Sequence, residues 1–160
     1  MQLSGEYISE HLGTTSPGEI LSQSLSLNVV YTSPESTAVA LSAAASLAED
    51  MEPTIHVRAM IPVPRQHPID YAFGAAQAIT RVVSDLLQRV GIDRCKYVLH
   101  VYICRNRIDT LLTVLRPSSL LVIGGRKRLW PTLETRISRI MRSAGHSVAF
   151  VDGKATGGVR

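Results

Sequence analysis

The stretch SSLLVIGG (residues 118–125) decides the fold of this chain. Its four apolar residues, 120–123, show no alternation with polar ones, which predicts a parallel strand covered on both faces. The pair Gly124-Gly125 follows and allows another group to approach the backbone closely. A basic segment (residues 126–142) and a second apolar run, SVAFV (residues 147–151), come next. The order strand, glycines, helix, strand is typical of an α/β unit, in which ligands bind at the carboxyl ends of the strands.

The rest of the chain repeats this alternation. Strands are predicted at residues 25–31, 54–61, 97–104, 120–123 and 147–151, and helices at residues 34–49, 69–90, 107–116 and 131–143. Ser33 and Pro34 indicate the start of the first helix, because serine caps free amides and proline fits the first turn. Gly91 is placed to end the second helix. We therefore predict a Rossmann-like three-layer α/β/α sandwich around a five-stranded parallel sheet.

The length of 160 residues suits one domain, and 45% hydrophobic against 19% charged residues predicts a globular one. We expect residues 1–24 to form an arm, residues 25–152 the domain, and residues 153–160 a flexible tail. No run approaches the ~18 apolar residues of a membrane span. The amino terminus lacks a secretory pattern, and the two cysteines fit no metal spacing. These features favour a cytoplasmic protein with reduced thiols.

Three segments resemble the universal stress protein family: NVVYTSPES (residues 28–36), AMIPVP (residues 59–64), and LLVIGG with the basic segment and SAGHSVAFV (residues 143–151). The similarity covers residues 25–152. It implies the family's fold, which is like that of the adenine nucleotide alpha hydrolases, and a role in stress response. It also implies a homodimer through the last strand, here Ser147, Val148, Ala149, Phe150 and Val151.

The chain departs from the ATP-binding members of that family at their phosphate site. Those members carry an acidic residue at the end of the first strand, where Tyr31 stands, and a phenol does not replace a carboxylate on magnesium. Their loop reads Gly, two residues, Gly, nine residues, Gly, then Ser or Thr. Here Gly124 matches the first glycine, Lys127 and Glu134 replace the others, Thr135 keeps the hydroxyl, and the loop is about three residues shorter. Because backbone amides then lose their close approach to phosphate, we predict a module without the usual ATP binding.

Nucleotide binding stays open as an alternative, because the cations of the Arg126-Lys127-Arg128 run can bind phosphate through their side chains. ATP or AMP, with magnesium, would then lie under residues 124–128, with the adenine against Met60 and Ile61. The candidate nucleotide residues are Tyr31, Thr32, Ser33, Met60, Ile61, Gly124, Gly125, Arg126, Lys127, Arg128 and Thr135.

Residues 126–142 hold six basic residues and one acid, which allows a surface facing RNA or a membrane. A solvated helix face is the simpler interpretation, so we do not expect nucleic acid as the partner. A regulatory domain working beside a transporter is a further alternative.

The histidines suggest structural roles. His100 lies in the middle of YVLHVYIC (residues 97–104) and is predicted to be hydrogen-bonded inside the fold. His56 and Arg58 alternate on one strand, and we expect them at an edge or an interface. His146 precedes the last strand, and we expect it at the surface.

No Ser-His-Asp set, carboxylate pair or metal cluster emerges, so we predict that the chain is not an enzyme and needs no cofactor or metal. Cys104 lies at the carboxyl end of a strand beside Arg105 and Arg107, where a thiol can be reactive, but we expect it buried and inert. Trp130 is predicted to cover the end of the sheet in place of the missing glycine loop. We therefore expect a homodimeric module that acts by protein association.

Overall fold

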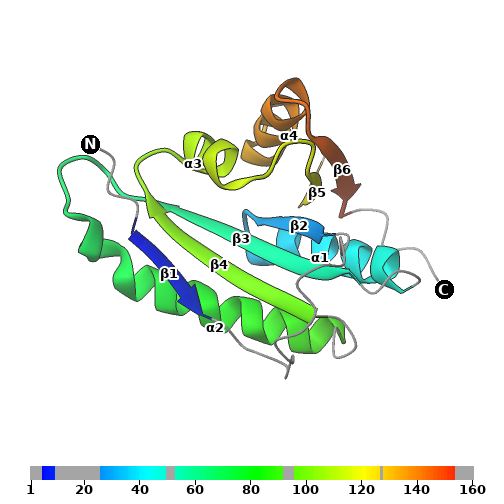
Figure 1. Ribbon diagram of the computed structural model, residues 1–160, viewed down its shortest axis with the longest axis horizontal. Helices are drawn as coiled ribbons and strands as arrows, with labels where there is room; N and C mark the ends of the chain where they lie inside the picture. The colour runs from blue at the N-terminus through cyan, green and yellow to red at the C-terminus, as the bar shows by residue number, and fades with distance from the viewer. Residues whose placement is uncertain (1–4, 10–25, 50–52, 92–95, 127, 154–160) are drawn as a thin grey trace.

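The computed structural model describes residues 5–9, 26–49, 53–91, 96–126 and 128–153 (Figure 1). Six strands form one sheet: β1 (Gly5–Ser9), β2 (Ser26–Tyr31), β3 (Thr54–Pro62), β4 (Lys96–Cys104), β5 (Leu120–Gly125) and β6 (Ser147–Asp152). The helices are α1 (Pro34–Ala48), a short 3-10 turn η1 (Ile69–Ala72), α2 (Phe73–Val90), α3 (Arg107–Val114) and α4 (Leu133–Ser143).

The strand order across the sheet is β1-β4-β3-β2-β5-β6. The five strands from β2 to β6 run parallel, which confirms the predicted five-stranded parallel sheet. The sixth strand, β1, pairs antiparallel with β4, from Gly5 opposite Ile103 to Ser9 opposite Leu99. It lies inside the predicted arm, and the sequence pattern did not indicate it. The other arm residues, 1–4 and 10–25, lie outside the described residues, as do tail residues 154–160.

Two helical layers enclose the sheet, with α1 and α2 on one side and α3 and α4 on the other (Figure 1). Each side has its own apolar core. The first core packs sheet residues such as Leu27, Val57 and Val101 with Ala40 and Leu87 of the helices. The second packs residues that include Val30, Met60, Ile123, Ile137 and Met141. The three-layer arrangement follows from apolar strands that must be covered on both faces.

Local signals set the ends of several helices. The Ser33 hydroxyl accepts a hydrogen bond from the amide of Ser36 at 3.2 Å, which starts α1 as predicted. Gly91 ends α2 in the left-handed region, at φ 72°, and this conformation favours glycine. Asn106 caps α3 by accepting from the amides of Ile108 and Asp109. The predicted second helix begins as the 3-10 turn η1 and becomes α-helical at Phe73.

The glycine pair belongs to β5, which continues two residues beyond its predicted end at residue 123. A side chain at Gly124 would clash with the backbone carbonyl oxygen of Ser36. The missing side chain therefore lets the first turn of α1 lie directly against the sheet. The group that approaches this backbone closely is a helix of the same chain.

Candidate functional site

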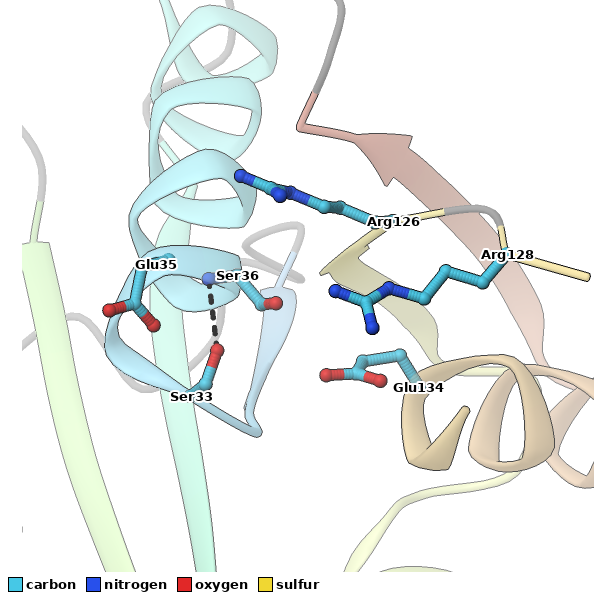
Figure 2. A pocket seen from close by; sticks show the side chains of 6 residues that line it. All are labelled: Ser33, Glu35, Ser36, Arg126, Arg128 and Glu134. Atoms are coloured by element: carbon cyan, nitrogen blue, oxygen red, sulfur yellow. Dashed lines mark hydrogen bonds between the residues drawn. The ribbon is translucent and has the colours of Figure 1, made fainter. Parts of the chain in front are cut away.

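A pocket of about 360 Å³ opens where β2 and β5 end side by side. It is lined by Ser33, Glu35, Ser36, Arg126, Arg128 and Glu134 (Figure 2). The chain leaves β2 toward β3 and leaves β5 toward β6, so the two connections separate at this point of the sheet. Such a switch point is where open α/β sheets bind ligands.

Three elements supply the pocket's side chains. Figure 2 shows the guanidinium groups of Arg126 and Arg128 directed from the end of β5 toward α1, and Glu134 directed into the pocket from the first turn of α4. Among the described residues of the lining, two guanidinium groups and two carboxylates, those of Glu35 and Glu134, give a formal charge of zero. The lining is therefore much less attractive to a polyanion than the basic sequence suggests.

Two amides at the start of α1 already have partners. The amide of Ser36 donates to the Ser33 hydroxyl, and the amide of Thr37 donates to the Ser33 carbonyl at 2.9 Å. The amide of Thr32 reaches the Thr37 hydroxyl at 3.4 Å. The backbone of Ser36 also lies against Gly124, so the close approach that this glycine allows is taken up by α1.

The pocket contains some of the predicted nucleotide residues. Ser33, Arg126 and Arg128 line it, and Gly125 lines a smaller adjoining hollow with Arg126. Met60 and Ile61 do not, because they are buried in the two apolar cores. Lys127 lies outside the described residues.

Three further residues of the predicted nucleotide site, Thr135, Tyr31 and Thr32, lie in the following surroundings. The Thr135 hydroxyl caps α4 by accepting from the amide of Thr132 at 2.8 Å and does not line the pocket. Tyr31 is half-buried at the end of β2, and burial, followed by the nearby Glu35 carboxylate, raises the pKa of its phenol. A phenol with a raised pKa stays protonated and does not serve as a magnesium ligand. The Thr32 hydroxyl oxygen is buried and has no hydrogen-bond partner within the described residues.

Sequence reasoning missed Glu35 and Ser36 as pocket residues. Both lie in the first turn of α1, directly after the cap at Ser33, and that turn faces the end of β5. The sequence held a signal for them, because the residues that follow a helix cap at a topological switch point face the ligand crevice.

A second polar cluster lies on the α3/α4 side of β2, β3 and β4. The Nε of Arg58 donates to Asn28 Oδ1 at 2.7 Å, and its NH1 donates to the Tyr102 hydroxyl at 2.7 Å. His56 Nδ1 and His100 Nε2 lie 3.0 Å apart. The prediction of a hydrogen-bonded His100 is confirmed. The expected edge position of His56 and Arg58 is wrong, because β3 lies inside the sheet between β2 and β4.

Both histidines of this cluster favour the neutral form. Burial lowers the pKa of His56 to about 4, with further lowering by Arg58, His100 and Arg116. Burial and Arg58 likewise lower the pKa of His100 to about 4. A protonated imidazole here would meet a guanidinium group in a partly dehydrated site.

Two other expectations are corrected. His146 is buried and not at the surface. Its Nδ1 accepts a hydrogen bond from the amide of Ser119 at 3.2 Å, which connects the turn before β6 to the turn before β5. Trp130 is 82% exposed, so it does not cover the end of the sheet. Cys104 is buried as expected, and burial raises the pKa of its thiol against the opposing effects of Thr110 and Arg107.

In the described part of the chain, no group of three or more His, Cys, Asp or Glu side chains could hold a metal ion. No helix in the same residues is long and apolar enough to cross a membrane.

No family model and no curated protein matches the chain. Solved structures do match. A universal stress protein family member from Burkholderia pseudomallei has a TM-score of 0.59 at 18% identity, over 79% of this chain and 94% of that one. A universal stress protein from Archaeoglobus fulgidus has a TM-score of 0.54 at 16% identity, over 80% and 93%. The Archaeoglobus fulgidus protein in complex with dAMP has a TM-score of 0.51 at 13% identity, over 81% and 98%. The chain therefore has the universal stress protein fold.

Proposed function

We propose that this chain is a universal-stress-protein-like module that acts in stress response by associating with proteins, first of all with a second copy of itself. It would do so in the cytoplasm, without catalysis and without a bound cofactor. The fold supports the family assignment, and the open edge of the sheet at β6 is the observation that carries the association.

Strand β6 is an edge strand, because it pairs only with β5 in the described sheet. The amides of Ser147 and Gly153 donate toward β5, to the carbonyls of Ser119 and Gly125. Since strand groups alternate in direction, the backbone groups of Val148 and Phe150 point away from the sheet. Such a row of groups is a template for another strand. A second copy related by a two-fold axis would supply that strand.

One outward group is already covered. The NH2 of Arg142, from the last turn of α4, donates to the carbonyl of Val148 at 3.1 Å. The arginine would have to move away when a second strand pairs with β6. Its removal should therefore leave dimerisation unchanged or strengthen it.

Light scattering after gel filtration tests the dimer. Val148→Pro removes an outward N–H and leaves the bonds to β5 in place, and proline is tolerated on edge strands. Two bonds are lost per symmetric dimer, at about 1 kcal/mol each, so we expect a roughly thirtyfold weaker dimer. Arg142→Ala is the matched control. A wild-type protein that stays monomeric at high concentration would exclude this function.

The pocket supports the absence of ATP binding in the family's loop mode. The described lining has a formal charge of zero, the amides of Ser36 and Thr37 have partners, and the backbone of α1 lies against Gly124, the first glycine of the loop. A triphosphate with magnesium needs several amides or cations and a carboxylate on the metal.

A nucleotide-regulated module is a second candidate, favoured by Arg126 and Arg128. Both guanidinium groups point into the pocket (Figure 2), and a single phosphate needs no glycine loop when two arginines hold it. Calorimetry with AMP, and separately with ATP and magnesium, tests this candidate. Binding that is lost in Arg126→Ala and kept in Arg139→Ala, on the outer side of α4, would establish it. Absence of heat with both nucleotides would exclude it.

A further inference from the structure

The loop between β5 and α4 exposes two large apolar side chains next to each other. Leu129 is fully exposed and Trp130 is 82% exposed, which makes them the most exposed large apolar residues in the described part of the chain. Single exposed apolar residues are common and need no explanation. An adjacent leucine and tryptophan that are both this exposed favour a surface covered by a partner.

Cations follow Leu129 and Trp130 in the sequence, along α4. Arg136, Arg139 and Arg142 are all exposed, while Ile137 and Met141 of the same helix are buried. Residues three positions apart lie along one side of a helix, so the three arginines form a stripe on the outer side of α4. The acid of this segment, Glu134, points into the pocket and does not neutralise the stripe (Figure 2).

We propose that Leu129, Trp130 and the arginine stripe form a binding surface for an anionic lipid bilayer. The indole and the leucine would enter the interface between headgroups and acyl chains, and the arginines would contact lipid phosphates. An apolar anchor and a basic patch are each weak alone, and together they give reversible membrane binding.

A membrane fits this combination better than a nucleic acid does. A nucleic acid offers phosphates to the arginines and bases to stack on Trp130. It offers no apolar environment in which the aliphatic side chain of Leu129 could be buried. A bilayer interface accepts both neighbouring side chains at the same depth. Leu129 therefore distinguishes the two kinds of partner.

The experiment uses the tryptophan as its own probe, because Trp130 is the only one in the chain. The full chain is mixed with vesicles of phosphatidylcholine, with or without about 30% phosphatidylglycerol, and both sedimentation and Trp130 emission are recorded. We expect a blue shift and co-sedimentation with anionic vesicles only. Arg139→Gln should weaken binding about fivefold. Leu129→Ala should weaken it about tenfold.

Leu47→Ala is the matched control, because Leu47 is a half-exposed leucine on α1. It should bind vesicles like the wild type. The Val148→Pro variant should also keep the blue shift, which separates this surface from the dimer edge. Failure to sediment with anionic vesicles would overturn the proposal. So would binding that Leu129→Ala leaves unchanged, or quenching of Trp130 by single-stranded RNA without vesicle binding.

Discussion

Both faces of the sheet carry an apolar core, but only one also carries a polar cluster, and β3 shows this difference within one strand. Ile55, Val57 and Ala59 point toward α1 and α2 and are buried in an apolar core. His56 and Arg58 alternate with them, point to the other side and are only partly buried. The helices that cover the first face have 15 and 18 residues, whereas α3 and α4 on the second face have 8 and 11.

Helix length explains the difference. Eight residues give α3 a length of about 12 Å, while the nine residues of β3 extend over about 30 Å. Figure 1 shows α3 over the carboxyl end of β3 and β4 only. Beyond it, this face carries polar residues that bind one another, the partly buried His56 and Arg58 beside the buried Asn28 and Tyr102. The extent of helical cover therefore decides where the sheet carries chemistry.

The glycine pair offers the strongest test of this contrast, because its two members meet opposite helical layers. A side chain at Gly124 would clash with the α1 backbone at Ser36, while one at Gly125 would meet the ring of Phe150 and the side chain of Glu134. Backbone cannot move without shifting the helix, whereas the closest contact of a Gly125 side chain is the far end of the Phe150 ring, and Glu134 would have to give by only a few tenths of an ångström. We expect Gly124→Ala to lower the free energy of unfolding by about 3 kcal/mol and Gly125→Ala by about 1 kcal/mol. Urea unfolding of both variants measures the difference.

Equal costs at the two glycines would contradict this close packing of α1. The two substitutions add the same methyl group to neighbouring residues of one strand, so each serves as the control for the other. A larger loss at Gly125 would mean that α4 is the more rigid layer.

The polar cluster gives a smaller expected effect. Arg58→Leu removes the donor to Asn28 Oδ1, and Asn28 is only 2% exposed, so its amide oxygen loses a partner that water does not easily replace. We expect a loss of about 2 kcal/mol in the free energy of unfolding. Asn28→Leu combined with Arg58→Leu should cost less than the sum of the single changes, because an apolar pair needs no hydrogen bond. Strictly additive losses would mean that the bond contributes nothing.

The fold was predictable because its strands are continuous apolar runs and its helices carry local start and end signals. Ser33 and Gly91 act through bonds within a few residues, so a single sequence reveals them. The burial of His146 depends on the amide of Ser119, 27 positions away, and no local pattern encodes that contact.

The candidate site was only partly predictable for a related reason. Arg126 and Arg128 were recognised as basic residues after a glycine pair, but the opposing carboxylates of Glu35 and Glu134 come from two other elements. The balance of charge among the described lining residues results from the assembly of α1, the end of β5 and α4. The same is true of the Arg58 cluster, whose members come from three strands and whose polarity depends on where α3 ends.

The histidine pair predicts how stability depends on pH. Their pKa values are about 4 in the folded chain, against 6.5 for an unperturbed imidazole, because burial and Arg58 oppose a second positive charge. The folded state therefore holds both rings neutral, and their contribution to stability is complete above pH 6.5. As the pH falls from 6.5 toward 4, the unfolded chain binds protons that the folded chain does not, and this contribution is lost.

The size of that loss is reduced because both rings are partly exposed and titrate as a pair. After this screening we expect about 1 to 2 kcal/mol. Urea unfolding at pH 7 and pH 4.5 measures it, with His56→Gln/His100→Gln as the variant that cannot titrate. The carboxylates contribute equally to both proteins, so the wild type should lose more stability than the variant over this range. Parallel losses would mean that the α3/α4 face is wetter than its burial indicates, and the contrast between the two faces would then rest on the glycine pair alone.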